Sequence, residues 1–217
     1  MKGLEVRLGD VPVTMLPAGA LHWAGGIAVA DLHLGKSGSL RRQGLAVPEG
    51  SDEETLRGLL NVLSAHDESR LVVLGDLFHS RHSLRDATRT WQAWLDKHEI
   101  QATLVPGNHD RARGPADGWN DVEVGTQMHG LALFHHPPEG ESRPWIAGHI
   151  LPLVLYFDEH VALRAPCFWP VGAGLVLPAF GAFTGGYVIE PTLTWACLGE
   201  RVVAIPEAMQ RPDRARR

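Results

Sequence analysis

A run of apolar residues, Leu71 to Leu74, ends at Gly75, and a carboxylate, Asp76, follows at once. Four apolar residues in a row, two of them β-branched, are typical of a strand that is covered on both faces. Gly75 allows the chain to turn where the strand ends, and open α/β sheets place their ligands at that edge. The pattern therefore predicts a buried strand with Asp76 at the rim of a sheet.

Two amphipathic helices are predicted between the strands of the first half. Leucines recur at helical spacing between residues 51 and 66, after Ser51 and Glu54, which form a capping-box pattern. A second helix is expected to begin with Ser83 and Asp86. Its inner face, which we interpret as core packing rather than a base-stacking surface, would carry Ala87, Trp91, Trp94 and Leu95.

Short apolar stretches, separated by glycine, proline or charged residues, predict the remaining strands. They occupy residues 2–8, 11–16, 27–30, 100–105, 122–124, 131–134, 145–147, 161–164, 175–177, 187–189, 193–196 and 202–205. The first half therefore reads as β-α-β, and the second half, which has no clear helix, reads as antiparallel β. This pattern predicts an α/β fold class in which two mixed sheets pack face to face with helices outside.

The composition is typical of one globular domain. The chain has 217 residues, 44% of them hydrophobic, so we expect a single domain over residues 1–209 and a disordered basic tail over 210–217. The formal net charge of −5 argues against a protein coated in basic charge for duplex DNA. Cys167 and Cys197 lack metal-binding spacing and are expected to be free thiols. No signal peptide or membrane span is apparent, so a cytoplasmic location is expected.

Hard or borderline metal ligands follow five of the predicted strands. They are Asp31 with His33, Asp76, Asn108 with His109, His135, and His149. A lone aspartate or histidine at a strand end is more often a turn former, but the repetition of one construction favours a site. Carboxylate, amide and imidazole ligands suit Mn²⁺, Fe²⁺ or Zn²⁺ better than Ca²⁺. Six ligands exceed what one catalytic ion needs, so we predict a two-metal site with Asp76 as the bridging carboxylate.

As a set, these motifs resemble the signature of the calcineurin-like metallophosphoesterases. The motifs are Asp31-x-His33, Gly75-Asp76, Gly107-Asn108-His109-Asp110, the His135 strand end and Gly148-His149. More closely, residues 31–36, 75–80 and 177–186 resemble the ligase-associated DNA-damage-response phosphoesterases, the PdeM or MPE type, over nearly the whole chain. This resemblance implies a four-layer αββα sandwich, dependence on two Mn²⁺ ions, and endonuclease action on single-stranded DNA in DNA repair. It also implies a DNA ligase and a helicase as partners.

The resemblance assigns roles by position. One metal ion is given Asp31, His33 and Asp76, and the other is given Asp76, Asn108, His135 and His149. His109 becomes the residue that contacts the scissile phosphate and protonates the leaving oxygen, with Asp110 beside it in the catalytic motif. His136 neighbours His135, and we choose His135 because it directly follows the apolar strand.

Three further residues are placed near the chemistry. His79 stands where many members of the superfamily carry an aspartate that pairs with the general-acid histidine, so His109 would receive less help in staying protonated. Lys36 and Arg111 are expected to guide the DNA strand into the site, with ordinary solvated charge as the alternative for each.

Leu151 departs from the pattern. The superfamily reads Gly-His-x-His, and this chain reads Gly148-His149-Ile150-Leu151. Leucine cannot ligate, so the ion held by Asp31 and His33 would lack one protein ligand unless another histidine, such as His160, replaces it. Three functions stay open: a DNA-directed nuclease, a phosphatase or pyrophosphatase acting on a small molecule or lipid headgroup, and a metal-poor nucleic-acid-binding module.

Overall fold

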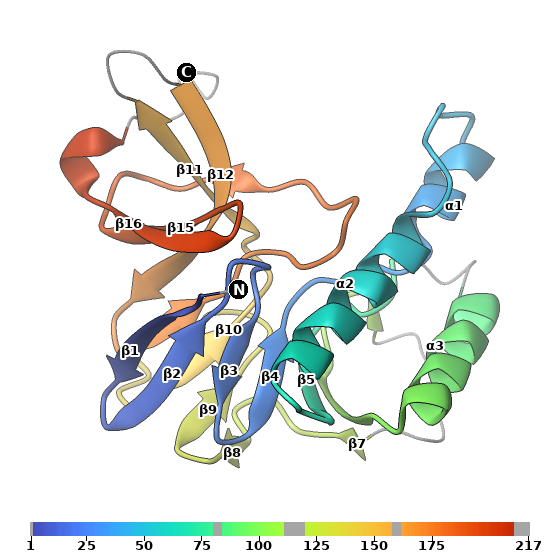
Figure 1. The fold of residues 1–217 in the computed structure, drawn as a ribbon, viewed down its shortest axis with the longest axis horizontal. Helices are drawn as coiled ribbons and strands as arrows, with labels where there is room; N and C mark the ends of the chain where they lie inside the picture. Colours follow the sequence, from blue (N-terminus) through green and yellow to red (C-terminus); the bar gives the residue numbers. More distant parts are fainter. Residues whose placement is uncertain (1, 80–83, 111–119, 158–161, 211–217) are drawn as a thin grey trace.

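Two mixed β-sheets, packed face to face, form the body of the molecule (Figure 1). The computed structural model describes residues 2–79, 84–110, 120–157 and 162–210. The first sheet has seven strands in sequence order: β1 (Leu4–Leu8), β2 (Val11–Met15), β3 (Leu21–Trp23), β4 (Gly26–Val29), β5 (Arg70–Leu74), β6 (Gln101–Val105) and β7 (Asn120–Asp121). Neighbouring strands are antiparallel from β1 to β4 and parallel from β4 to β7.

The second sheet has nine strands, and its main path runs in the order β14-β11-β12-β13-β10-β9-β8. Its strands are β8 (Gln127–Met128), β9 (Leu131–Leu133), β10 (Trp145–Ala147), β11 (Pro152–Phe157), β12 (Ala162–Val171), β13 (Gly174–Val176), β14 (Tyr187–Val188), β15 (Thr194–Leu198) and β16 (Arg201–Ile205). Strand β15 pairs with β12 and β16 beside the main path. Strands β9, β10 and β13 are parallel, so their carboxyl ends meet at one edge.

Three α-helices are present among the described residues: α1 (Lys36–Arg42), α2 (Ser51–Ala65) and α3 (Leu84–His98). A 3-10 helix, η3 (Glu207–Met209), follows β16. Helices α2 and α3 cover the outer face of the first sheet, where Leu59, Trp91 and Leu95 pack against strand residues such as Val73 (Figure 1). Trp91 is fully buried, which confirms the core role predicted for the inner face of that helix.

A second apolar layer lies between the sheets. Leu74 and Val105 of the first sheet meet Leu133, Ile146 and Leu175 of the second. The outer face of the second sheet has its own cluster, built around Trp145 and Val176, to which no residue of α1, α2 or α3 belongs. The predicted fold class, two mixed sheets face to face with helices outside, is confirmed.

Two predicted element ends are wrong. Helix α2 begins after Gly50, and Ser51 does not cap it, because its hydroxyl donates to Ser37 Oγ instead (2.8 Å). Residues 122–124 are not a strand, because the short edge strand β7 pairs with β6 two residues earlier, at Asn120–Asp121. Strands β3, β8 and β11 have no counterpart in the prediction.

At the carboxyl end, the predicted tail begins too early. Gln210 is buried, and its amide nitrogen donates to the Ile205 carbonyl (2.8 Å), so the packed region includes it. Residues 211–217, like Ser83 at the predicted helix start, lie outside the described residues. Cys167 and Cys197 are free thiols, as predicted. In the part of the chain that the structure describes, no helix combines the length and the apolar character needed to cross a membrane.

Candidate two-metal site at the strand ends

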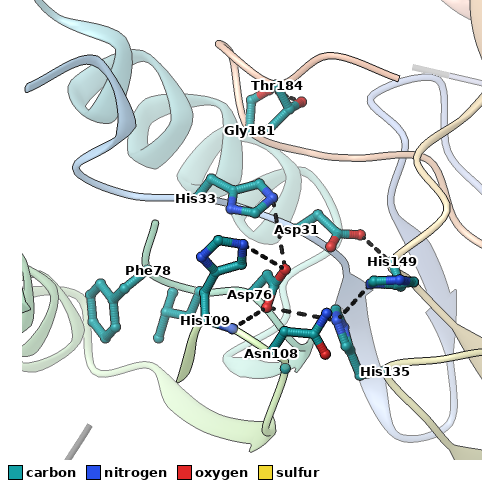
Figure 2. Close-up of polar contacts among 12 residues, drawn as sticks. Asp31, His33, Asp76, Phe78, Asn108, His109, His135, His149, Gly181 and Thr184 are labelled. Carbon is teal, nitrogen blue, oxygen red and sulfur yellow. Dashed lines mark hydrogen bonds and ion pairs between the residues drawn. The ribbon is translucent and has the colours of Figure 1, made fainter. Parts of the chain in front are cut away.

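The parallel arrangement of β4, β5 and β6 brings their carboxyl ends to one edge of the first sheet. Asp31, Asp76 and Asn108 follow these three strands. Backbone hydrogen bonds continue beyond the strands, from the Asp31 amide to the Gly75 carbonyl (3.2 Å) and from the His33 amide to the Asp76 carbonyl (2.9 Å). Ligands that the sequence places on separate strand ends therefore lie side by side (Figure 2).

The second sheet contributes two histidines to the same place. His135 follows β9 and His149 follows its parallel neighbour β10, with the Gly148 amide donating to the His135 carbonyl (3.0 Å). The His149 amide donates to Asp31 Oδ2 at 2.8 Å. This bond joins the two sheets at the site itself.

Two glycines allow the strand ends to approach so closely. Gly75 has a φ of +80°, and a Cβ at this position would lie 2.1 Å from His135 Nδ1. A Cβ at Gly107 would lie 2.3 Å from Asp76 Oδ1. A side chain at either position would displace His135 or Asp76. Glycine is therefore required here to make room for the ligand side chains, in addition to allowing the turn at Gly75.

Asp76 is at the centre of the cluster. Ligand atoms lie within 4.8 Å of one another in three groups: Asp31, Asp76 and His135; His33, Asp76 and His109; and His135, His136 and His149. Asp76 Oδ1 accepts the His109 amide (2.9 Å) and lies 3.6 Å from His135 Nε2. Asp76 Oδ2 lies 4.0 Å from His33 Nε2. The two carboxylate oxygens thus face different histidines, as a bridging ligand requires.

Burial makes this cluster unfavourable for negative charge. Asp31 is 1% exposed, and burial raises its pKa well above the usual value, with the nearby Asp76 charge adding to the effect. The hydrogen bond from the His149 amide acts in the opposite direction. Two buried carboxylates this close need a positive partner to be ionised together.

Two histidines of the cluster, His33 and His149, favour the neutral form, which has a lone pair for a metal. Burial lowers the pKa of His33 to about 3, although the Asp76 charge opposes it, and lowers the pKa of His149 to about 4. Nδ1 of His33 is buried and has no hydrogen-bond partner among the residues that the structure describes.

The geometry favours His135 over His136 as the buried ligand. Nδ1 of His135 lies 2.9 Å from the Leu74 carbonyl, which can only accept, so this nitrogen carries the proton. Nε2 then has its lone pair toward Asp76 and toward His149 Nδ1 (3.2 Å). A ligand oriented by such a backbone bond is common in metal sites. His136 is exposed, yet its Nε2 lies 2.7 Å from Asn108 Oδ1, and its ring contacts that of His149.

His109 and His79 lie together at the mouth of the cluster. The His109 side chain is 42% exposed, and its Nε2 lies 3.9 Å from Asp76 Oδ2. Its ring stacks on that of His79, with centroids 5.5 Å apart and 18° between the planes. Burial, followed by the positive charge of Lys36, lowers the pKa of His79. Lys36 is therefore near this pair, and Arg111 lies outside the described residues.

Asp110 faces away from the open side. It is 2% exposed, and its carboxylate accepts the amides of Gly107 (2.9 Å), Phe78 (3.3 Å) and Leu77 (3.4 Å). Asp110 therefore ties the turn that carries Asn108 and His109 to the turn that follows Asp76. This geometry indicates a positioning residue.

Leu151 lies in a bend rather than in an extended segment. His149 and Leu151 both have left-handed backbone, with φ of 71° and 53°, and the Ile150 amide donates to the Gly148 carbonyl (2.9 Å). Leu151 lines a cavity beside the site. His160, the substitute ligand considered from the sequence, lies outside the described residues.

Sequence reasoning gave no role to the segment from Pro178 to Gly186, which borders the site. The Phe180 amide donates to the Ala30 carbonyl (2.9 Å), and the Gly181 amide donates to the Asp31 carbonyl (3.4 Å). Residues 177–186 are glycine-rich and belong to one of the motifs that carry the resemblance, which could have indicated a role. Only the fold, however, brings this segment close to Asp31 (Figure 2).

Comparisons with known proteins agree with this geometry. The family model described as calcineurin-like phosphoesterase matches residues 27–164, which include every strand end described above. The solved structures that match include a crystal structure of Pseudomonas putida nuclease MPE, with 28% identity and a TM-score of 0.76. That alignment covers 94% of this chain and 100% of the nuclease chain. No curated protein matches the sequence. The chain belongs to the calcineurin-like phosphoesterase family and is a metal-dependent phosphoesterase.

Proposed function

We propose that this chain is a two-metal phosphodiesterase that cleaves single-stranded DNA as an endonuclease. The observation that carries the proposal is the convergence of strand ends from two sheets around Asp76, where candidate ligands form three overlapping groups, each with its ligand atoms within 4.8 Å of one another. The similarity to Pseudomonas putida nuclease MPE supports a nucleic acid as the substrate.

The donor set fits a pair of divalent metal ions. Asp31 and Asp76 are buried together, so their ionised forms need positive charge nearby, and among the described residues His33 Nδ1 is buried without a hydrogen-bond partner. One ion would take Asp31, His33 and Asp76, and the other Asp76, Asn108, His135 and His149. Mixed oxygen and imidazole ligands suit Mn²⁺, which we propose, and Fe or Zn fit the same chemistry. When bound, the metals supply Lewis-acid charge at the phosphoryl oxygen and lower the pKa of water.

The residues at the mouth of the cluster perform the proton transfer. His109 is half exposed with Nε2 toward Asp76, so it would reach a phosphodiester and donate its proton to the departing sugar oxygen. General-acid assistance of this kind is worth about 10²–10⁴-fold in rate. His79, stacked on His109 and favoured in the neutral form, adds no carboxylate charge at the point where a phosphate dianion would bind.

This electrostatic setting favours a diester over a monoester. A diester has one negative charge and a monoester has up to two. Because His79 supplies no carboxylate to keep His109 protonated, the site has less positive charge for a dianion and suits the diester. Lys36, near His79 and His33, would contact the DNA backbone. The net charge of −5 favours an unpaired strand, because duplex binding depends on many cationic contacts.

The cellular setting follows from the same proposal. Cleavage of unpaired DNA suits a cytoplasmic repair enzyme, and the resemblance to ligase-associated phosphoesterases supports a DNA ligase and a helicase as partners in that pathway.

One experiment separates the candidate functions. Purified protein is supplied with Mn²⁺ and assayed on single-stranded DNA, duplex DNA, bis(p-nitrophenyl) phosphate and p-nitrophenyl phosphate. We expect cleavage of single-stranded DNA and of the diester, little cleavage of the monoester, and full loss with a chelator. Preferential hydrolysis of the monoester would instead identify a phosphatase. DNA binding without any hydrolysis would identify a binding module.

A further inference from the structure

A cavity of about 400 Å³ lies beside the metal cluster, and none of the roles above uses it. Its walls come from three segments that are distant in the sequence: the start of β11 with Leu151 and Leu153, the middle of β12 with Arg164, and the loop from Ala179 to Gly186. A cavity of this size is large enough for one nucleotide unit.

One wall of the cavity contacts the strand end that carries Asp31. Gly181, in its wall, donates its amide to the carbonyl of the metal ligand Asp31 (3.4 Å). A Cβ at Gly181 would lie 2.3 Å from the Leu32 carbonyl oxygen, so loop and site are in direct contact. Leu151 follows His149 by two residues on the other side. Figure 2 shows Gly181 and Thr184 on the segment above His33 and Asp31.

The loop is held by hydrogen bonds and is therefore preformed. Thr184 Oγ1 donates to the Gly181 carbonyl (2.8 Å), and the Ala182 amide donates to Thr55 Oγ1 of helix α2 (2.9 Å). Arg164 donates to the Gly186 carbonyl from one guanidinium nitrogen (2.9 Å). Because Arg164 is exposed, its remaining donors face solvent at the cavity wall.

Two aromatic residues in or directly after this loop are exposed. Phe183 is 40% exposed in the same loop, and Tyr187, which begins β14, is 56% exposed. Exposed aromatic rings and a cation are the features with which proteins bind unpaired nucleic acid, because bases stack on the rings and the guanidinium binds phosphate. A base-paired strand could not offer its base faces to these rings.

We propose that this cavity binds the nucleotide that flanks the scissile phosphodiester of an unpaired DNA strand. Arg164 binds the next phosphate along the strand, and Phe183 stacks on a base. The inference rests on the proposed nuclease function and extends it, because it assigns the selection of single strands to this wall rather than to the metal cluster.

Gly185 provides a test by obstruction. Gly185 lines the cavity, a Cβ added there meets no atom within 4 Å, and its φ is not in the left-handed region, so the backbone accepts a side chain at this wall. Gly185→Leu should obstruct the nucleotide, whereas Gly185→Ala should have little effect. Arg164→Gln removes the phosphate contact, and Phe183→Leu removes the stacking face, which Phe183→Trp keeps.

The assay measures KM and kcat with Mn²⁺ on a single-stranded oligonucleotide and on bis(p-nitrophenyl) phosphate, which is too small to reach the cavity and the metals together. Gly185→Leu, Arg164→Gln and Phe183→Leu should each raise KM for the oligonucleotide about tenfold, with the small diester within twofold of wild type. Arg164→Gln should also reduce the salt dependence of oligonucleotide binding by about one unit of slope. Arg70→Gln is the matched control, because Arg70 begins β5 at the edge opposite the site.

The outcomes separate the two proposals. If wild-type protein cleaves the oligonucleotide and the three variants keep its KM, this inference is wrong and the nuclease function stands. Equal losses on both substrates would also overturn it, since the variants would then act through the metal cluster or the fold. If wild-type protein hydrolyses only the small diester, the nuclease proposal fails first and the inference fails with it.

Discussion

Leu151→His should strengthen the binding of the metal ion that we propose for Asp31 and His33. The resemblance described above implies histidine at this position, and in the proposed assignment leucine leaves that ion with Asp31, His33 and the shared Asp76 as protein ligands. Three protein ligands are enough for a catalytic site, so wild-type protein is expected to be active with excess Mn²⁺. The substitution places an imidazole two residues after His149, in the bend beside the cluster.

The structure indicates that the substitution leaves the fold intact. Leucine at a φ of 53° carries a cost of about 1 kcal/mol, and histidine is found there more readily. Against this, replacing a half-buried leucine loses about 1 kcal/mol of apolar burial. The two effects offset, so the thermal midpoint should change by less than about 3 °C. A further metal ligand should improve affinity by about 10–100-fold, the range measured when even indirect supports of a ligand are removed.

The assay is a titration of Mn²⁺ against diesterase activity, with metal content after dialysis as an independent readout. Leu151→His should reach half-maximal activity at about 10–100-fold lower Mn²⁺ and retain more metal per chain. Leu153→His is the matched control, because Leu153 lines the same cavity farther along β11. Coincident titrations for wild type and Leu151→His would refute the missing-ligand reasoning.

Asp76→Ala should abolish metal retention and turnover because the bridge is lost, and full metal content in this variant would contradict the two-metal assignment. His109→Ala should lose about 10²–10⁴-fold in phosphodiesterase rate while metal content stays unchanged; undiminished cleavage would exclude the general-acid role. His79→Asp places a carboxylate beside the His109 ring, 5.5 Å away between centroids, and should raise monoesterase relative to diesterase activity. Gly75→Ala would bring a Cβ to 2.1 Å from His135 Nδ1 and should lower both the thermal midpoint and metal content, whereas Gly185→Ala should change neither.

The pattern of apolar residues and the turn residues predicted the buried strands of the fold. Residues 71–74 are apolar throughout because β5 is covered on both faces, so the strand and the ligand after it could be located from the sequence. Short edge elements could not be located in this way. Strand β7 has two exposed residues, and β8 has one exposed and one half-buried residue, so neither has an apolar pattern to detect.

The sequence could locate the candidate ligands at strand ends, but not their arrangement around Asp76. Asp76 lies between His33 and His109 because β5 is the neighbour of both β4 and β6. This order of strands is a property of the topology, which the sequence pattern does not reveal. The choice between His135 and His136 depends on a contact with the Leu74 carbonyl, 61 positions away in the chain. The capping role expected for Ser51 failed for the same reason, since its hydroxyl is bonded to Ser37 in another helix.

Backbone conformation links the site to the stability of the protein. Among the described residues, eight that are not glycine have positive φ, and five of them are Asp31, His33, Asp76, His149 and Leu151. Each such conformation costs about 1 kcal/mol, and the burial of two carboxylates adds to that cost. Hydrogen bonds from the His149 amide to Asp31 and from the His109 amide to Asp76 offset part of it. Metal binding would compensate the buried charge and hold the strained turns in place. The residues that lower the stability of the metal-free protein would therefore also give the bound metals a fixed geometry.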